Sequence, residues 1–253
     1  MKSEKIPKME DAFKAVNNLF ESVIEAKNTL GDERLWWRGQ PKKYPSLNTK
    51  IHRNLNHSDP YREFNIIHEF VRQAPTRYPS WPKKRCNQLF LMQHYGLSTR
   101  LLDWSSNFLI ALYFAVNKEP DEPASLWALN PIKLNRKQFP NSNKAIFLYN
   151  SPEVEKIINS AFDGAFSGEK YILAMAGLEF DLRIFVQQSV FTIHASPISL
   201  EDLQKELNDT FLYEINIPAE DKNSLRQALE IFGITESHLF PDIQSLASYL
   251  ESH

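Results

Sequence analysis

Apolar positions recur with helical spacing in several segments of the chain. In the segment at about residues 9–28 they fall on one face of a helix, and these positions are Phe13, Val16, Leu19, Phe20, Val23 and Ile24. The same periodicity predicts further helices at about residues 59–74, 83–95, 106–118, 152–163, 220–232 and 242–251. Ser105 or Ser106 is the expected N-cap of the helix at 106–118.

Shorter runs rich in β-branched and aromatic residues predict strands. They lie at residues 34–38, 125–129, 145–149, 171–174, 182–186, 190–194 and 211–217. Most helices come early and most strands come late, an order typical of the α+β class. We therefore expect a helical N-terminal half packed on a mostly antiparallel sheet. No linker rich in Gly, Ser or Pro divides the chain, so one domain is expected over residues 1–253.

Composition excludes several classes of function. The net charge of −2 provides no overall basic field for nucleic acid or an anionic membrane. Cys86 is the single cysteine, which excludes an internal disulfide and a multi-cysteine metal site. The patterns GxGxxG, GxxxxGK[ST], HExxH and GxSxG are absent, and the histidines lack the spacing of metal ligands. We expect no metal site and a buried, unreactive Cys86.

The chain also lacks an apolar run long enough for a signal peptide or a membrane span. A cytoplasmic protein without a membrane partner is therefore expected.

Three segments place polar residues where a plain core would be apolar. The first is Trp36-Trp37-Arg38-Gly39-Gln40, in which Arg38 stands inside an aromatic strand. A buried arginine needs a partner, and its guanidinium suits a carboxylate or a phosphate. Arg38 is therefore either a clamp for an anionic substrate, with Trp37, Gly39 and Gln40 beside it, or one half of a structural ion pair.

The second segment, from Gln93 to Asn107, is the densest in polar residues. Gln93 falls on an apolar helix face and needs a hydrogen-bond partner there. Arg100 and Asp103 flank a Leu-Leu pair, so we expect both to be buried and to pair with each other or with close neighbours. The segment is either a buried network that holds the loop or a pocket wall that presents Gln93, His94, Tyr95, Thr99 and Asn107.

The third segment, Arg183–His194, contains two adjacent glutamines, Gln187 and Gln188, between two predicted strands. Taken alone, this pattern favours a hairpin turn.

These motifs occur together, in this order, in a known family. They are Trp37-Arg38-Gly39-Gln40, residues 93–107, Ala111–Ala115, Arg183–Phe191 and residues 233–242. With them the chain resembles the FRG-domain family over about residues 33–250. Trp37 stands where that family carries Phe, and Ser189 stands where its members commonly carry Gly.

The order of the motifs is also similar to that of the ADP-ribosyltransferase superfamily. This resemblance implies a split sheet that takes NAD as a substrate, with no permanently bound cofactor. It places Arg38 against the pyrophosphate or ribose, and it gives catalytic roles to Arg38, His94, Gln187 and Gln188. The implied substrate-binding residues are Trp37, Gly39, Gln40, Gln93, Tyr95, Thr99, Arg100, Asp103 and Asn107.

One element of those transferases is not apparent in this sequence. A late-strand glutamate is missing, since Glu179 and Asp181 lie upstream of the paired glutamines. A glutamine can orient a ribose hydroxyl, but it cannot act as a general base.

Three hypotheses about function follow. The first is an ADP-ribosyltransferase-like enzyme, as a bacterial toxin or phage-defence effector, with a protein or nucleic-acid acceptor and an antitoxin or defence-system partner. The second is a non-catalytic module that binds a nucleotide or nucleic acid. The third is a hydrolase or nuclease that uses the pocket between Gln93 and Asn107.

Overall fold

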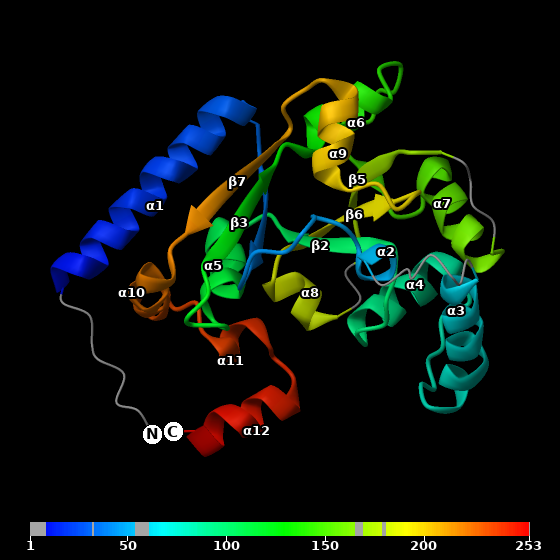
Figure 1. Ribbon diagram of the computed structural model, residues 1–253. Helices are drawn as coiled ribbons and strands as arrows, with labels where there is room; N and C mark the ends of the chain where they lie inside the picture. Colours follow the sequence, from blue (N-terminus) through cyan, green and yellow to red (C-terminus); the bar gives the residue numbers. More distant parts are fainter. Residues whose placement is uncertain (1–8, 32, 54–60, 165–168, 179–180, 253) are drawn as a thin grey trace.

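The computed structural model describes residues 9–31, 33–53, 61–164, 169–178 and 181–252. Its described strands form a 7-stranded sheet in the order β4-β5-β6-β2-β1-β3-β7 (Figure 1). Neighbouring strands are antiparallel, except that β4 and β5 are parallel. The strands are β1 (Trp36–Gln40), β2 (Leu101–Ser105), β3 (Ala124–Leu129), β4 (Phe147–Leu148), β5 (Ile172–Ala176), β6 (Ser189–His194) and β7 (Leu212–Ile217).

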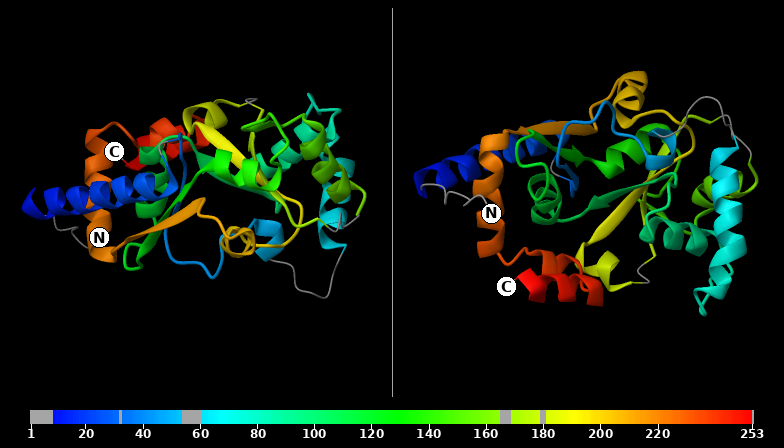
Figure 2. Two further views of the ribbon diagram at one scale, coloured as in Figure 1. Left: turned by 90° about the horizontal axis from the view of Figure 1, so that it is seen from above. Right: turned by 60° about the horizontal axis from the view of Figure 1, so that its bottom comes forward.

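Helices lie on both faces of this sheet. They are α1 (Met9–Leu30), α2 (Lys50–Arg53), α3 (Arg62–Gln73), α4 (Arg85–His94), α5 (Phe108–Val116), α6 (Pro131–Gln138), α7 (Pro152–Phe162), α8 (Leu182–Val186), α9 (Leu200–Leu207), α10 (Ala219–Ile231), α11 (Glu236–Leu239) and α12 (Ile243–Ser252), with a 3₁₀ turn at Ala74–Thr76. Figure 2 shows α1 and α10 crossing at one end of the molecule, where they pack together. None of the described helices is long and apolar enough to cross a membrane.

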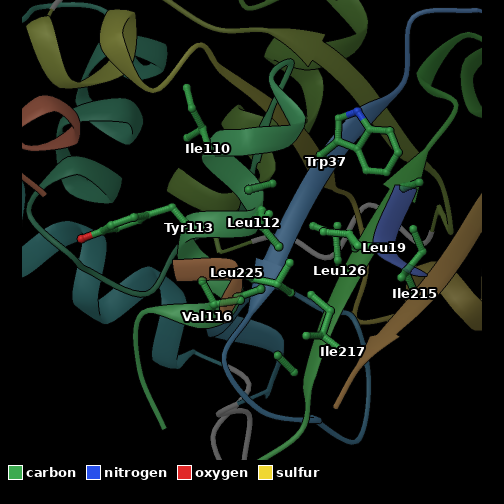
Figure 3. Close-up of a cluster of buried hydrophobic side chains, with 14 of the residues drawn as sticks. Leu19, Trp37, Ile110, Leu112, Tyr113, Val116, Leu126, Ile215, Ile217 and Leu225 are labelled. Carbon is green, nitrogen blue, oxygen red and sulfur yellow. The ribbon is translucent and has the colours of Figure 1, made fainter. Parts of the chain in front are cut away.

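Three apolar clusters hold these layers together. On one face, α1, α5 and α10 cover β1, β3 and β7, and Trp37, Leu112 and Leu126 lie in that cluster (Figure 3). On the same face, α3, α4 and α7 cover the β5–β6 half of the sheet. On the opposite face, α6 and α9 pack over Trp36, Trp104 and other residues of the central strands. Alternation along β1 explains this division, because Trp36 and Trp37 point to opposite faces.

Gly39 allows α5 to lie directly on β1. A Cβ atom at this position would be 1.9 Å from the Ala111 carbonyl oxygen and 2.5 Å from the Ala115 backbone nitrogen. Both neighbours are backbone atoms of a packed helix, so they cannot move aside without displacing α5. The close approach of helix and strand therefore requires glycine here.

Replacing Gly39 with Ala should lower the free energy of unfolding by about 3 kcal/mol or more, because the strand and helix must separate. Urea denaturation measures this change. Gly96→Ala is the matched control, since Gly96 has φ +79° and a Cβ added there would meet no atom within 4 Å. Only backbone strain applies at that position, at about 1–2 kcal/mol. Equal losses in the two variants would contradict the packing argument.

The α+β class and the mostly antiparallel sheet are confirmed. The predicted helical N-terminal half is wrong in one respect, because β1, β2 and β3 come early in the chain and form the middle of the sheet. Strand β2 was not predicted, and helices α2, α6, α9 and α11 were also missed. The predicted helix at 59–74 is observed as α3, and residues 59 and 60 lie outside the described part of the chain.

Two local predictions are also corrected. Residues 182–186 form the short helix α8 rather than a strand, because Asp181 caps the first turn by accepting a hydrogen bond from the Arg183 backbone N–H at 2.7 Å. Asn107, and not Ser105 or Ser106, is the N-cap of α5, where its side chain accepts from the Leu109 N–H at 2.9 Å.

Candidate functional site

The sheet is continuous from β2 to β1, but its pairing is sparsest at this junction, which we call the sheet split. β1 pairs with β3 from Trp36 to Gln40, whereas its register with β2 joins only Trp37 to Ser105. A cleft of about 690 Å³ lies at this split. Its walls come from β1, α4, β2, α5, α8 and the C-terminal helices, which are far apart in the sequence. This volume falls in the range of pockets that bind small molecules and cofactors.

Arg38 lies in this cleft and spans the split. One terminal nitrogen of its guanidinium, Nη1, donates a hydrogen bond to the Asp103 backbone oxygen across the gap at 2.6 Å. Its Nε is buried and has no hydrogen-bond partner among the described residues. Burial lowers the pKa of Arg38, the Asp103 carboxylate opposes that shift, and Arg53 adds to it. An arginine stays protonated in proteins, so a buried donor of this charge needs an acceptor.

Gln93 joins α4 to β2 beside Arg38. Its amide nitrogen donates to the Asp103 carboxylate at 2.7 Å, and its amide oxygen accepts from the Thr99 hydroxyl. The Thr99 hydroxyl oxygen also accepts from the Leu101 backbone N–H at 3.2 Å. The predicted partner for Gln93 therefore exists, and this network fixes Asp103 opposite Arg38.

Residues 33–124 match the family model of the FRG domain. The chain contains an FRG domain. The matched range carries β1, α4, β2 and α5, and so it includes both sides of the sheet split. The expected continuation of the family match to residue 250 lies beyond this range. No curated protein and no solved structure matches the chain significantly.

The structure brings part of the predicted site together. The predicted residues that line the cleft are Trp37, Arg38, Gly39, Gln93, His94, Asp103 and Gln187. Segments separated by almost 150 residues of sequence therefore meet at the sheet split.

The other predicted site residues have contacts of their own. Gln40 accepts from the Trp127 indole N–H at 2.9 Å, Thr99 is buried behind Gln93, and Asn107 caps α5. Tyr95 is exposed at the end of α4. Gln188 is exposed with φ +46°, and its side-chain oxygen accepts from the Ser106 hydroxyl at 3.4 Å.

Of the two expected pairings, that of Arg100 with Asp103 is wrong, and so is the expected burial of Asp103. Arg100 is buried, but its partner is Glu63 on α3, with Nε to Oε1 at 2.8 Å and Nη2 to Oε2 at 2.5 Å. Asp103 has an exposed side chain on β2. Arg100 precedes β2 and reaches α3 and α7, whereas the Asp103 carboxylate accepts from Gln93 on α4, so the two side chains have different partners.

His94 and Gln187 have neighbours that limit their predicted catalytic roles. The His94 Nε2 lies 3.9 Å from a carboxylate oxygen of Asp181, so an ion pair forms when the ring is protonated. The Gln187 amide nitrogen donates to the Leu239 backbone oxygen at 3.0 Å. Glu179 lies outside the described residues. In the described part of the chain, no group of three or more potential ligands could hold a metal ion, and Cys86 is buried.

Several residues of the cleft were not predicted from the sequence to belong to the site. They are Tyr44, Tyr113, Phe114, Arg183, Glu236, Phe240 and Ser245. Burial raises the pKa of Tyr113 to about 12, and the Glu236 carboxylate adds to that shift. Glu236 and Phe240 belong to the segment 233–242, which was part of the family resemblance, so that resemblance was the one available signal for them.

Proposed function

We propose that the cleft binds NAD and that the protein transfers ADP-ribose from NAD to an acceptor. The observation that carries this proposal is Arg38, a cation at the sheet split whose buried Nε lacks a partner among the described residues. A diphosphate or ribose oxygen would accept from that donor in a charge-assisted hydrogen bond. The motif order that resembles the ADP-ribosyltransferase superfamily supports the same ligand.

The walls of the cleft suit the remaining parts of a dinucleotide. Tyr44, Tyr113, Phe114 and Phe240 offer aromatic surfaces for the two bases. Arg183 adds a second cation at the α8 side of the cleft. A dinucleotide with two ring systems and a diphosphate matches this distribution of apolar and cationic groups.

Transfer breaks the bond between nicotinamide and ribose and forms a bond from the same ribose carbon to the acceptor. Positive charge develops on the ribose as nicotinamide leaves with the bonding electrons, and the acceptor loses a proton. Glu236 is a carboxylate in the cleft that could stabilise this charge or take that proton. It would supply the function of the glutamate that those transferases carry on a late strand. Such an NAD-consuming activity would suit a toxin or a phage-defence effector controlled by an antitoxin.

A non-catalytic nucleotide-binding module is the second candidate. The position of Gln187 favours it, because the Gln187 amide nitrogen donates to the Leu239 backbone oxygen. That nitrogen is therefore not directed to a ribose hydroxyl. Under this alternative, Arg38 still binds the nucleotide, but nicotinamide is not released.

Arg38→Ala should reduce nicotinamide release by about 100-fold, because the cation that stabilises the bound diphosphate is lost. Arg38→Lys should recover little of it, because a lysine lacks the planar fork of donors. Incubation of each variant with NAD and cell extract, followed by chromatography, measures the release. Arg72→Ala is the control, since Arg72 is an exposed arginine paired with Glu69 on α3. Saturable NAD binding by the wild type without any release would favour the second candidate.

A further inference from the structure

The C-terminal helices form one wall of the cleft. Glu236 on α11, Phe240 after it and Ser245 on α12 all line the cleft. Leu239 anchors this wall, since its side chain is fully buried in the cluster beneath α5. α12 follows the anchor and carries exposed apolar residues, Ile243 and Leu250. Among the described side chains, the buried anchor of this wall therefore lies on α11.

Two neighbouring elements hold α11 in place. From α8, the Gln187 amide nitrogen donates to the Leu239 backbone oxygen at 3.0 Å, and the Arg183 guanidinium lies 4.9 Å from the centre of the Phe240 ring. From α5, the Phe114 ring meets Phe240 edge to face at 6.1 Å. The hydrogen bond from Gln187 is the directional contact among these three.

The geometry of α11 explains why this hydrogen bond matters. A helix of four residues satisfies few of its own carbonyl groups, and the Leu239 oxygen belongs to its last turn. The Gln187 amide supplies a donor to that oxygen. No backbone N–H of α11 can do so, because the helix ends there.

Gln187 is itself fixed to the sheet split. Its backbone oxygen accepts from the Ser105 hydroxyl at 2.8 Å, and its backbone N–H donates to the Arg183 oxygen at 3.0 Å. Ser105 is the β2 residue that pairs with Trp37, next to Arg38. A continuous chain of contacts therefore runs from the split, through Gln187 and Leu239, to the helix that carries Glu236.

We propose that Gln187 is a positioning residue that holds α11 and α12 against the cleft and so sets the place of Glu236. Gln187 acts through α11 and need not touch the ligand. Gln187 holds this wall whatever the cleft binds. The effect of Gln187 on catalysis, through Glu236, rests on the proposed function.

The two adjacent glutamines provide a matched pair for the test. Hydrogen exchange of the full-length, ligand-free protein is measured for Gln187→Ala, Gln187→Glu and Gln188→Ala. Gln187→Ala should speed exchange of the amides in residues 236–252 by about five- to tenfold, the effect expected from the loss of one hydrogen bond. Gln187→Glu keeps the size of the side chain but has no N–H to donate at neutral pH, so it should behave like Gln187→Ala. Gln188→Ala should match the wild type, and the amides of β1 and β3 should keep their protection in all variants.

Equal exchange in Gln187→Ala and the wild type would overturn the proposal, as would wild-type exchange in Gln187→Glu. A general rise in exchange across the sheet would also overturn it, since that result would make Gln187 an ordinary stabilising residue. Turnover gives a second readout: Gln187→Ala should lower kcat for nicotinamide release about tenfold, because Glu236 is displaced. It should raise the KM for NAD less than Arg38→Ala does, because Arg38 is intact and only the wall that carries Phe240 is loosened. If the wild type releases no nicotinamide while the exchange results hold, the proposed function fails and the role of Gln187 stands.

Discussion

Glu63→Ala should lower the free energy of unfolding by about 3–5 kcal/mol, because it leaves the buried charge of Arg100 without its partner. The Arg100 side chain is 4% exposed and that of Glu63 is 12% exposed, so water cannot replace the lost carboxylate. Arg100 also donates to the Ser160 hydroxyl at 2.8 Å and to the Ile157 backbone oxygen at 3.1 Å. Those two neutral acceptors remain in the variant, but they do not balance the charge.

Urea denaturation of the variant measures this loss. Asp103→Ala is an informative control, because Asp103 is exposed and its carboxylate accepts a hydrogen bond from the neutral Gln93 amide. That variant should lose about 1 kcal/mol. Glu69→Ala removes an exposed ion pair with Arg72 and should change stability by less than about 1 kcal/mol. A loss at Asp103 as large as that at Glu63 would contradict the assignment of the pair.

Acidification should destabilise the protein strongly between about pH 6.5 and pH 5. His52 and His194 are 8% and 0% exposed, and their rings lie 6.3 Å apart. Burial lowers the pKa of His52 to about 3, with Arg100 adding to the shift. Burial likewise lowers the pKa of His194 well below its usual value, with further contributions from His52, Arg38 and Arg100, which outweigh the opposing effect of the Ile198 backbone.

Stability falls with acidification because both histidine rings take up protons near pH 6.5 in the unfolded state. The stability that comes from keeping them neutral is complete above that pH and is lost as the pH falls toward the folded values. Two such groups cost about 2.7 kcal/mol per pH unit, or about 4 kcal/mol at pH 5. Urea midpoints measured from pH 7.5 to pH 5 test this expectation. The double variant His52→Gln, His194→Gln should show a much flatter dependence, and an unchanged slope in that variant would contradict it.

The sequence predicted the elements whose pattern is local. The apolar face of α1 and the continuous apolar run of α5 are visible without tertiary information, and so is Gly233, which follows α10 with φ +75°. Strand β2 was not predicted because it carries the charged Asp103, which is exposed between buried neighbours, and directly follows the charged Arg100, which is buried. A run of five residues such as α8 is too short for its periodicity to distinguish helix from strand.

In the candidate site, too, local patterns could be predicted from the sequence and tertiary contacts could not. Arg38 and Gln93 were predicted because a polar group in an apolar element needs a partner. The partner of Arg100 could not be predicted, since Glu63 lies 37 residues away and the contact depends on how α3 packs against the sheet. Glu236 lies on a short helix whose place at the cleft depends on tertiary contacts, among them the buried Leu239 and the hydrogen bond from Gln187. Nothing local in the sequence around Glu236 indicates that position.

The central claim is that Arg38 binds an anionic nucleotide at the split between β1 and β2. Calorimetric titration of NAD into the wild type, Arg38→Lys and Arg72→Lys tests it most directly. Arg38→Lys keeps the charge but removes the planar donors, so NAD should bind it at least about tenfold more weakly than the wild type. Arg72→Lys, an exposed substitution on α3, should bind NAD as the wild type does. Equal affinity of the wild type and Arg38→Lys, or no binding of NAD to the wild type, would contradict the claim.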